Sequence, residues 1–525
     1  MPRAAVAIGA NLVSQEIIIA SDCWPEVLYG TIVTFNLLQG DRPGNIRAAL
    51  RALHELDVQV FQLSRLYESA PAYVTDQPAF LNAAALVDTQ LRPLELLQAL
   101  KQVEAQLGRD FGGQRWGPRP IDLDIIFYEG DVVNQPGNLL VVPHPRWQER
   151  AFVQAPLADL WPRGSPEAGS TVSKGGRSNS SSSSSKNEDN NGPTAAAAAC
   201  EGLEERLLFA RQLWEQAGGE SQLGDPDLEC VMPLGGKLTG ELWRWQRRAQ
   251  VMGIINVTPD SFSDGGRHYG VEAALEAGRR MVAEGADVID VGGQSTHPAS
   301  QPLTPQEEVQ RVVPVIRALA EDEATRGTPL SIDTYYAEVA EAAVAVGASI
   351  VNDVSGGLLD ERMLPTVAEL GVPYVLMHMR GTPQTMQSRE HTAYTDVCAE
   401  VTVELQAAGE RALAAGIEPW RLILDPGLGF AKAGDDSMVL MASLRRLRRL
   451  LSPPLRHLPL LLGPSRKGFL GRLTGRKVAA ERDHATAAAA ALCVAEGANI
   501  VRAHNVPATC DALRVVDAFC KVRPA

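Results

Sequence analysis

The sequence predicts an α/β protein with two folded domains joined by a disordered linker, and three observations lead to this prediction. Residues 248–525 alternate strand-like and helix-like segments throughout. Residues 163–247 contain the low-complexity run SKGGRSNSSSSSSKNEDNNGP, which cannot bury enough apolar surface to fold. Residues 1–162 have a mixed pattern of their own, and the length of 525 residues fits a division into domains of about 150 residues.

The C-terminal region predicts a TIM (β/α)8 barrel. Its strand-like segments are continuous apolar runs, which is typical of parallel strands buried on both faces. A doubly wound sheet is the alternative, but no G-x-G-x-x-G follows the first strand. Eight β-α units are the count of the barrel. The eight expected strands are residues 251–256, 286–293, 330–334, 349–354, 374–379, 421–427, 459–465 and 499–505.

The N-terminal region predicts a smaller α+β sandwich of the ferredoxin-like kind, because its elements follow one another with few long crossovers. Inside the linker, residues 201–216 have the apolar spacing of a helix and are expected to dock on a folded domain. The expected strands of the first domain are residues 5–11, 58–69, 77–89 and 121–128, and its expected helices are residues 45–56 and 91–109.

Composition excludes several kinds of partner. Acidic residues outnumber Lys and Arg by 63 to 49, which gives a net charge of −14. We therefore expect no binding to nucleic acid or to an anionic membrane, since both require a basic face. No apolar run reaches the roughly 18 residues of a membrane span.

The cysteines and the N-terminus bear on the compartment. The seven cysteines are scattered, without a C-x-x-C pair, so they indicate neither a zinc knuckle nor a redox motif. Isolated thiols are typical of a reducing compartment. An apolar segment begins almost at once and leaves no room for a targeting peptide. The sequence as given predicts a cytoplasmic protein, or a mitochondrial one if the N-terminus is truncated.

Polar residues cluster at the C-terminal ends of the expected barrel strands, which is the active face of this fold. The acceptors among them suit a flat heterocycle that presents adjacent N–H and NH2 donors. The cationic residues follow the last two strands, where this fold commonly binds phosphate. A single such residue would more often be a strand cap, but the number of them favours a site. The acceptors are Asp333, Asn352 and Asp425, and the cationic residues are Lys467, Arg502 and His504.

Eight motifs in order make the C-terminal region resemble dihydropteroate synthase. This resemblance implies condensation of 6-hydroxymethyl-7,8-dihydropterin pyrophosphate with p-aminobenzoate, with release of pyrophosphate. The motifs are NVTPDSFSDGG (256–266), DVGGQSTHP (290–298), SIDT (331–334), NDVSGG (352–357), LMHMRGTP (376–383), DPGLGFAK (425–432), GPSRKGF (463–469) and VRAHN (501–505).

The resemblance also implies which barrel residues bind each group. It assigns Asp333, Asn352, Asp425 and Lys467 to the pterin, with Asp333 and Lys467 as catalytic residues. It assigns Asn256, Arg502 and His504 to pyrophosphate, with Mg²⁺ associated with Asn256. It assigns Thr296, Pro298, Phe430, Ser465 and Lys467 to p-aminobenzoate. One departure is His297, which stands where the family usually has Arg; we expect a tolerated substitution, the alternative being weaker binding of an anionic substrate.

The segment RDFGGQRWGPRPIDLDIIFY (109–128) carries the chemistry of the first domain. Asp122 and Asp124 lie two apart on a strand and project from the same face, where they can share Mg²⁺ ions. Arg109, Arg115 and Arg119 flank them and can close over a polyphosphate. A D-x-D pair alone is weak evidence, because a half-exposed strand gives the same pattern. No P-loop motif is present in the sequence.

Together with QPAFLNAA (77–84) and VPHPRWQERAF (142–152), this segment resembles 6-hydroxymethyl-7,8-dihydropterin pyrophosphokinase. The resemblance implies ATP as co-substrate and a product that is the substrate of the barrel. Phe111 stands where bacterial relatives have a catalytic-loop Arg. The resemblance assigns Asp122 and Asp124 to two Mg²⁺ ions, Phe80, Asn82, Trp116 and Phe152 to the pterin, and Glu104, Arg109, Arg119, His144 and Arg150 to the nucleotide, with both Asp residues, Arg109 and Arg119 catalytic.

Residues 13–39 interrupt the G-x-N-x-G-D motif of this family, and deleting them restores GANLGDRPGN. One hypothesis is a translated, unspliced intron, because Val-Ser and a final Gln are compatible with splice-site codons. The other is a loop beside the first strand, although IIIA and Trp24 are an unusual composition for a solvated loop.

The sequence thus predicts a bifunctional folate-biosynthesis transferase that consists of a pyrophosphokinase domain (1–162), a linker (163–247) and a dihydropteroate synthase barrel (248–525). Its expected partners are hydroxymethyldihydropterin, ATP and p-aminobenzoate, and by analogy a second copy of the barrel in a homodimer. Alternatives are a pterin-binding methyltransferase barrel, or a first domain that the insertion has made inactive.

Overall fold

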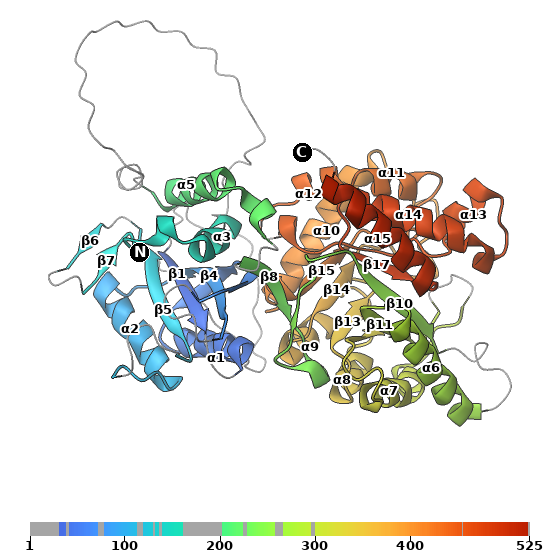
Figure 1. Ribbon diagram of the computed structural model, residues 1–525, viewed down its shortest axis with the longest axis horizontal. Helices are drawn as coiled ribbons and strands as arrows, with labels where there is room; N and C mark the ends of the chain where they lie inside the picture. Colours follow the sequence, from blue (N-terminus) through green and yellow to red (C-terminus); the bar gives the residue numbers. More distant parts are fainter. Residues whose placement is uncertain are drawn as a thin grey trace, which may run out of the picture. The chain divides into compact units, whose positions relative to one another are not determined.

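The computed structural model describes residues 31–37, 41–71, 78–112, 119–129, 132–135, 139–160, 202–223, 228–257, 266–295, 300–453 and 455–522. The chain divides into two compact units at residues 228 and 229, shown in blue to green and in green to red in Figure 1. Each unit is described by itself.

The first unit is an α+β sandwich, as the sequence predicted. Four of its strands lie in the order β5-β1-β4-β3, and β2 pairs with β4 as well. The pairs of β4 with β1, β2 and β3 and the pair of β1 with β5 are all antiparallel. Helices α1 and α2 contact one another, and α3 packs on β3, β4 and α5 (Figure 1). The elements are β1 (Thr31–Leu37), α1 (Arg42–His54), β2 (Gln59–Leu63), β3 (Leu66–Ser69), β4 (Phe80–Asp88), α2 (Pro93–Gln106), β5 (Asp122–Phe127), β6 (Val133–Asn134), β7 (Val141–Val142) and α3 (Ala151–Asp159).

The strand between β4 and β5 differs from the expected one. The expected strand over residues 5–11 lies outside the described residues. Strand β1 instead consists of Thr31–Leu37, which falls inside the segment 13–39 that the sequence analysis treated as an insertion. Its sequence TIVTFNL is rich in β-branched and aromatic residues, which favour strands, and Val33 is fully buried. Residues 31–37 are therefore an inner strand of the sheet and not part of a surface loop.

The expected single strand over residues 58–69 is also divided in two. Strands β2 and β3 both pair with β4 but are separated at Ser64 and Arg65. The backbone N–H of Arg65 donates to Asp159 Oδ2 at 2.9 Å, away from the sheet. The break therefore has a local cause, namely a buried hydrogen bond to the end of α3.

Part of the segment predicted as linker is folded. Helix α5 (Leu203–Gln216) packs on α3, in agreement with the docked helix that the spacing predicted. Arg211 Nη2 donates to the carbonyl of Ala158 at 3.0 Å, and Arg65 Nη2 lies 2.5 Å from Glu220 Oε1 just after α5. In the second unit, β8 (Leu228–Pro233) pairs with β9 (Leu242–Trp243). The linker predicted over 163–247 is thus ordered at residues 203–223 and 228–247.

The second unit is the expected parallel barrel. Its eight strands follow the order β15-β14-β13-β12-β11-β10-β17-β16. A parallel bridge between Leu424 and Leu460 joins the two ends of this order. All eight expected strands are present. They are β10 (Gln250–Asn256), β11 (Val288–Gly292), β12 (Leu330–Asp333), β13 (Ile350–Asp353), β14 (Tyr374–Met377), β15 (Leu422–Asp425), β16 (Leu461–Leu462) and β17 (Ile500–Ala503).

Helices surround the barrel strands (Figure 1). No described helix is long and apolar enough to cross a bilayer. The helices are α6 (Gly266–Ala283), α7 (Pro305–Glu321), α8 (Ala337–Ala345), α9 (Met363–Leu370), α10 (Val397–Ala414), α11 (Asp436–Ala442), α12 (Leu444–Leu450), α13 (Gly468–Thr474), α14 (Asp483–Ala495) and α15 (Val506–Val522).

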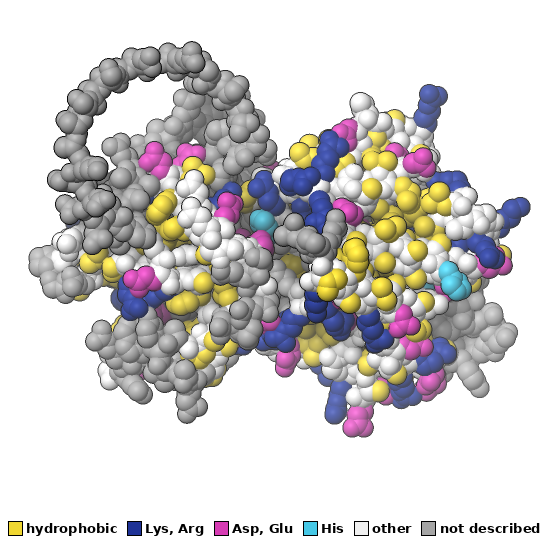
Figure 2. Space-filling view, turned by 45° about the horizontal axis from the view of Figure 1, so that its top comes forward, with side chains coloured by type: hydrophobic (Ala, Val, Ile, Leu, Met, Phe, Trp, Pro, Cys, Tyr) yellow, Lys and Arg dark blue, Asp and Glu magenta, His cyan; other side chains and the backbone are white. Residues whose placement is uncertain are grey.

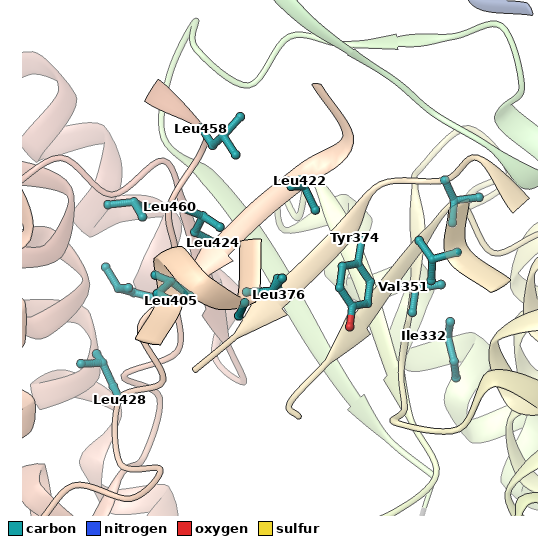
Figure 3. Packing of buried hydrophobic residues seen from close by; sticks show 14 of the residues in the cluster. Ile332, Val351, Tyr374, Leu376, Leu405, Leu422, Leu424, Leu428, Leu458 and Leu460 are labelled. Atoms are coloured by element: carbon teal, nitrogen blue, oxygen red, sulfur yellow. The ribbon is translucent and has the colours of Figure 1, made fainter. Parts of the chain in front are cut away.

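The core of the barrel explains why its strands are continuous apolar runs. Figure 3 shows Leu376, Leu422 and Leu424 on neighbouring strands, and each of them is fully buried. Tyr374 is buried too, and its hydroxyl donates to Asp353 Oδ2 at 2.7 Å. Because helices cover the outer face, both sides of the strands are largely apolar, and most of the polar residues lie toward the strand ends.

Candidate active sites

A network of charges occupies the C-terminal end of the barrel. Arg502, on β17, donates from Nε to Asp290 Oδ2 at 2.6 Å and from Nη2 to Asp333 Oδ2 at 2.7 Å. Asn352, on β13, donates from Nδ2 to the same Oδ2 of Asp290 at 3.2 Å. One guanidinium thus joins the ends of β11, β12 and β17, and the predicted residues Asp333, Asn352 and Arg502 belong to one connected network.

Asp425 and Lys467 complete the predicted heterocycle site. Asp425 ends β15, and its Oδ1 accepts a hydrogen bond from the backbone N–H of Gly427 at 2.7 Å. Lys467 Nζ lies 3.9 Å from the centre of the Phe430 ring, within the range of a cation–π contact. Burial raises the pKa of Asp425 to about 6, and the charge of Lys467 opposes that shift. Phe430 and Lys467, both assigned to p-aminobenzoate from the resemblance, are therefore neighbours.

Ser465 and His504 form a second contact on the rim. The hydroxyl of Ser465 lies 2.9 Å from His504 Nδ1, and the backbone N–H of His504 donates to the same hydroxyl at 3.1 Å. Burial, together with the charges of Arg466 and Arg502, lowers the pKa of His504 to about 4. His504 is therefore neutral at pH 7, whereas the sequence analysis grouped it with the cations.

Several predicted residues of the barrel are not in these contacts. Asn256 ends β10 and is exposed. Thr296, Pro298 and the departing residue His297 lie outside the described residues.

Sequence analysis missed the role of several buried groups near the rim. Asp290 was noted at a strand end but given no function, although it is fully buried and accepts from both Arg502 and Asn352. Glu308, in the first turn of α7, is also fully buried, and neither of its carboxyl oxygens has a hydrogen-bond partner among the described residues. Burial and the charge of Asp333 raise the pKa of Glu308 to about 8. An acidic residue inside an amphipathic helix pattern gives no signal of burial.

The first unit holds a compact cluster of charges around the D-x-D pair. Arg109 Nη1 lies 2.6 Å from Glu104 Oε2 and also forms an ion pair with Asp122. Arg119 Nη1 lies 3.1 Å from Asp122 Oδ2. Glu104 is fully buried on α2, and its Oε1 accepts from the backbone N–H of Leu123 at 2.6 Å. The cluster therefore joins α2 to β5 and connects four of the predicted residues.

The two carboxylates of this pair differ in their surroundings. Asp124 forms no hydrogen bond or ion pair with the described residues, whereas Asp122 contacts two arginines. Burial, then the charge of Asp122, raises the pKa of Asp124 to about 6. Burial alone would also raise the pKa of Asp122, but Lys101, Arg109 and Arg119 together lower it. A half-buried, unpaired carboxylate beside a paired one suits a hard divalent cation such as Mg²⁺.

Strand β1 connects this cluster to a predicted pterin residue. Asn36 lies opposite Asn82 on β4 and opposite Asp122 on β5. Residues directly opposite one another in antiparallel strands share a face, so Asn82 and Asp122 project from the same side of the sheet. Asn82 is buried, and its Oδ1 has no hydrogen-bond partner in the described residues. That free acceptor is available to a donor on a ligand.

The remaining predicted residues of the first unit lie at its edges. Burial, then the charges of Arg150 and Arg146, lowers the pKa of His144 to about 4. Arg150 lies over the ring of Phe152, with 5.7 Å between the guanidinium carbon and the ring centre. Phe80 begins β4 and is half-buried. Phe111 is exposed and lies under Arg109. Trp116 and Arg115 lie outside the described residues.

No group of three or more His, Cys, Asp or Glu side chains in the described residues has the geometry of a metal site. On the face of the barrel unit seen in Figure 2, Lys and Arg side chains are interspersed with hydrophobic and acidic ones. Neither observation changes the two sites described above.

Comparison with known proteins matches each unit to a different pterin enzyme. The family described as 7,8-dihydro-6-hydroxymethylpterin-pyrophosphokinase matches residues 35–162. The family described as pterin binding enzyme matches residues 252–504. The first match begins inside β1, in agreement with the use of residues 31–37 as a strand of the sheet.

Whole-length relatives carry both units. The mitochondrial folate synthesis bifunctional protein of Pisum sativum is 43% identical over 487 residues, which cover 92% of this chain and 88% of the relative. The folate synthesis bifunctional protein of Arabidopsis thaliana is 41% identical over 488 residues, 92% of this chain and 94% of the relative.

Relatives of the barrel alone also exist. The dihydropteroate synthase of Mycobacterium leprae is 46% identical over 280 residues, 52% of this chain and 95% of the relative. A solved structure of Xanthomonas albilineans dihydropteroate synthase with 4-aminobenzoic acid is 43% identical, covers 56% of this chain and all of that one, and has a TM-score of 0.49.

The fold and the two sites thus define a two-unit pterin enzyme. The chain belongs to the family of bifunctional folate synthesis proteins, which join a hydroxymethylpterin pyrophosphokinase to a pterin-binding barrel.

Proposed function

We propose that this chain catalyses two consecutive steps of folate synthesis. The first unit transfers pyrophosphate from ATP to 6-hydroxymethyl-7,8-dihydropterin. The barrel then joins that product to p-aminobenzoate, which gives 7,8-dihydropteroate and releases pyrophosphate. The observation that carries the proposal is that two differently built polar sites lie in two units that match the two successive enzymes. An inactive first unit is not favoured, because its sheet is continuous from β5 to β3.

In the first step, the hydroxymethyl oxygen of the pterin attacks the β-phosphorus of ATP, AMP leaves, and the hydroxyl proton passes to solvent. Asp122 and Asp124 would hold Mg²⁺, which neutralises the phosphate charge when bound. Arg109 and Arg119 would bind phosphate oxygens as they leave Asp122. Asn82 would bind the pterin, with Phe80, Trp116 and Phe152 against its ring, and Glu104, His144 and Arg150 would line the nucleotide side.

In the second step, the bond between the pterin methylene and pyrophosphate breaks, and the neutral aromatic amine attacks the methylene carbon and releases a proton. Asp333, Asn352 and Asp425 would accept the N–H groups of the pterin, and Asp333 and Lys467 would act beside the reacting centre. Positive charge that develops on the pterin is stabilised by nearby carboxylates, and negative charge on the leaving group by Arg502.

Other residues of the barrel would bind the leaving group and the second substrate. We propose that Asn256, Arg502 and His504 contact pyrophosphate. A single exposed amide such as Asn256 would hold Mg²⁺ only together with the diphosphate itself. Thr296, Pro298, Phe430, Ser465 and Lys467 would line the site for p-aminobenzoate.

A coupled assay tests the proposal directly. The full-length chain is supplied with hydroxymethyldihydropterin, ATP, Mg²⁺ and p-aminobenzoate, and AMP and dihydropteroate are measured separately. Both products are expected. AMP without dihydropteroate would contradict the barrel assignment, and dihydropteroate formed only from added pterin pyrophosphate would contradict the first-unit assignment.

Two further proposals concern the state of the protein in the cell. We propose a homodimer through the barrel, tested by sedimentation over a range of concentrations. The compartment is proposed as the cytoplasm, with mitochondria as the alternative; two relatives, from Pisum sativum and Arabidopsis thaliana, are named as mitochondrial. Fractionation of cells that express the natural transcript decides between them.

A further inference from the structure

A row of polar side chains, buried at Lys432 and His378, lies behind the loop that follows β15, and neither proposed reaction uses it. Lys432 Nζ lies 2.8 Å from His378 Nδ1, and His378 Nε2 lies 2.9 Å from Glu404 Oε2 on α10. Arg380 Nε donates to Glu404 Oε1 at 3.0 Å. Lys432 is only 6% exposed and His378 only 4%. The row thus extends from Arg380 and Glu404 through His378 to Lys432, which lies in the loop of residues 425–432.

The chemistry of the three groups fixes the direction of these hydrogen bonds. Burial lowers the pKa of Lys432 to about 7, and in its ammonium form Lys432 can only donate, so Nδ1 of His378 is then the acceptor. The proton of a neutral imidazole then sits on Nε2 and is donated to Glu404. Burial, then the charge of Lys432, lowers the pKa of His378 to about 4, which agrees with a neutral ring. The row is thus Lys432 to His378 to Glu404, anchored by Arg380.

The row meets the site at Asp425. The backbone N–H of His378 donates to the Asp425 carbonyl at 2.8 Å. Gly427 has a φ of +72°, and a Cβ there would lie 2.1 Å from the His378 carbonyl and 3.5 Å from Lys432 Nζ. The loop thus packs so closely on His378 and Lys432 that only glycine fits at this position. The backbone N–H of Gly427 also donates to Asp425 Oδ1 and so orients this carboxylate.

The charge of Lys432 also lowers the pKa of Asp425. Burial raises the pKa of Asp425, and the charges of Lys467, Lys432 and Arg502 oppose that shift. The other charged groups that face Lys432 are Glu404, Arg380 and Asp436. Apart from the bond to His378, Lys432 makes no hydrogen bond to the described residues, so its other donors are not committed to holding the fold.

We propose that Lys432, held by His378 and Glu404, is a positioning residue that keeps Asp425 a carboxylate and aims it at the pterin. This inference deepens the proposed function, on which it rests, because it assumes that Asp425 binds the pterin. It assigns the row to recognition of the pterin rather than to p-aminobenzoate or to the leaving pyrophosphate.

The test compares Lys432→Met with the wild type and with Lys521→Met, an exposed lysine on α15, in the full-length chain. Binding of hydroxymethyldihydropterin pyrophosphate is measured from pH 5.5 to 9, and the KM for p-aminobenzoate is measured alongside. Loss of a cation at this range raises a carboxyl pKa by roughly one to two units. We therefore expect pterin affinity at pH 7 to fall about two- to tenfold and to recover by pH 9. The KM for p-aminobenzoate should change less than about twofold, since Phe430 and Lys467 remain.

A matched pair of variants at His378 tests the row independently of Lys432. Asn at this position keeps an acceptor where Nδ1 stands, whereas Leu keeps none. His378→Asn should bind pterin within about twofold of the wild type, and His378→Leu should shift the acid limb as Lys432→Met does. If Lys432→Met does not fold, as judged by thermal unfolding, this pair decides the question.

Three results overturn the inference. One is an acid limb for Lys432→Met that coincides with the wild type, another is a loss of affinity that is equal at every pH, and the third is equal behaviour of the two His378 variants. Asp425→Asn separates this outcome from failure of the proposed function. If Asp425→Asn binds pterin as the wild type does, the pterin site itself is wrong; if it does not bind and Lys432→Met is normal, only the row is wrong.

Discussion

The two sites of this chain are assembled in opposite ways. In the first unit, the D-x-D pair lies within one strand, and Arg109 and Arg119 precede Asp122 by 13 and 3 residues along the chain. In the barrel, Asp290, Asp333 and Arg502 belong to three different strands and span more than 200 residues, yet they share two hydrogen bonds. A local site can be recognised from spacing, whereas a site on a barrel rim is recognisable only when the strands have been placed.

The two sites also differ in how their acids are compensated. Asp122 has three cations nearby, Lys101, Arg109 and Arg119, so that removing one leaves two. Asp290 and Asp333 share the single guanidinium of Arg502. The barrel site therefore depends on one residue for its charge balance, and the first site does not.

The largest expected effect separates the two activities. Asp122→Ala removes the paired carboxylate at the proposed Mg²⁺ site and should lower AMP formation on the order of 10³-fold, because such an ion supplies several kcal/mol of charge stabilisation. Dihydropteroate formation from added pterin pyrophosphate should be unchanged. Asp57→Asn, in an exposed turn where Asn tolerates the positive φ of 57°, is the control. Equal loss of both activities would mean that the sites are not independent.

The difference in charge compensation is tested by two arginine variants. Arg502→Ala removes the guanidinium that forms ion pairs with both Asp290 and Asp333 and should destabilise the barrel by about 3–5 kcal/mol. Arg109→Ala should cost the first unit clearly less, because Lys101 and Arg119 remain beside Asp122. Thermal unfolding, followed separately for the transition of each unit, measures the loss of stability in both variants. Equal costs would contradict the contrast drawn above.

Glu308 provides a test with pH, and its sign follows from the direction of its shift. Its folded pKa of about 8 lies above its ordinary value, so the folded barrel retains a proton that the unfolded chain releases. Stability due to this group is complete below the unfolded pKa and is lost as pH rises toward 8. Glu308→Gln should not lose this stability, which is of the order of a few kcal/mol, as the pH rises. It should therefore unfold at a higher temperature than the wild type at pH 8–9. A variant less stable than the wild type at pH 9 would disprove the unpaired, protonated state.

The smallest expected effect concerns the rim contact between Phe430 and Lys467. Phe430→Leu keeps an apolar side chain and removes the aromatic face, which is worth about 0.5–2 kcal/mol to a cation. The KM for p-aminobenzoate should rise about two- to thirtyfold, and AMP formation in the first unit should not change. A rise in the KM for the pterin substrate alone would mean that Phe430 contacts the pterin and not p-aminobenzoate.

Particular elements show where prediction from sequence succeeded and where it could not. The eight barrel strands were predictable because burial on both faces makes each one a continuous apolar run. Strand β1 was not, because residues 31–37 lie inside the segment that interrupts the family motif, and only their pairing with β4 and β5 shows that they belong to the sheet. The ordered residues 228–247 were missed because β8 and β9 are short and lie close to a low-complexity run.

The sequence by itself determined the two domains, the alternation of the barrel and most of the proposed site residues, since periodicity and motif spacing are properties of the chain. Tertiary structure alone decided that one arginine serves Asp290 and Asp333, that Glu308 is buried without a partner, and that Lys432 lies behind Asp425. Charge compensation and desolvation depend on distances of a few ångströms between residues far apart in the chain, and no local pattern encodes those distances.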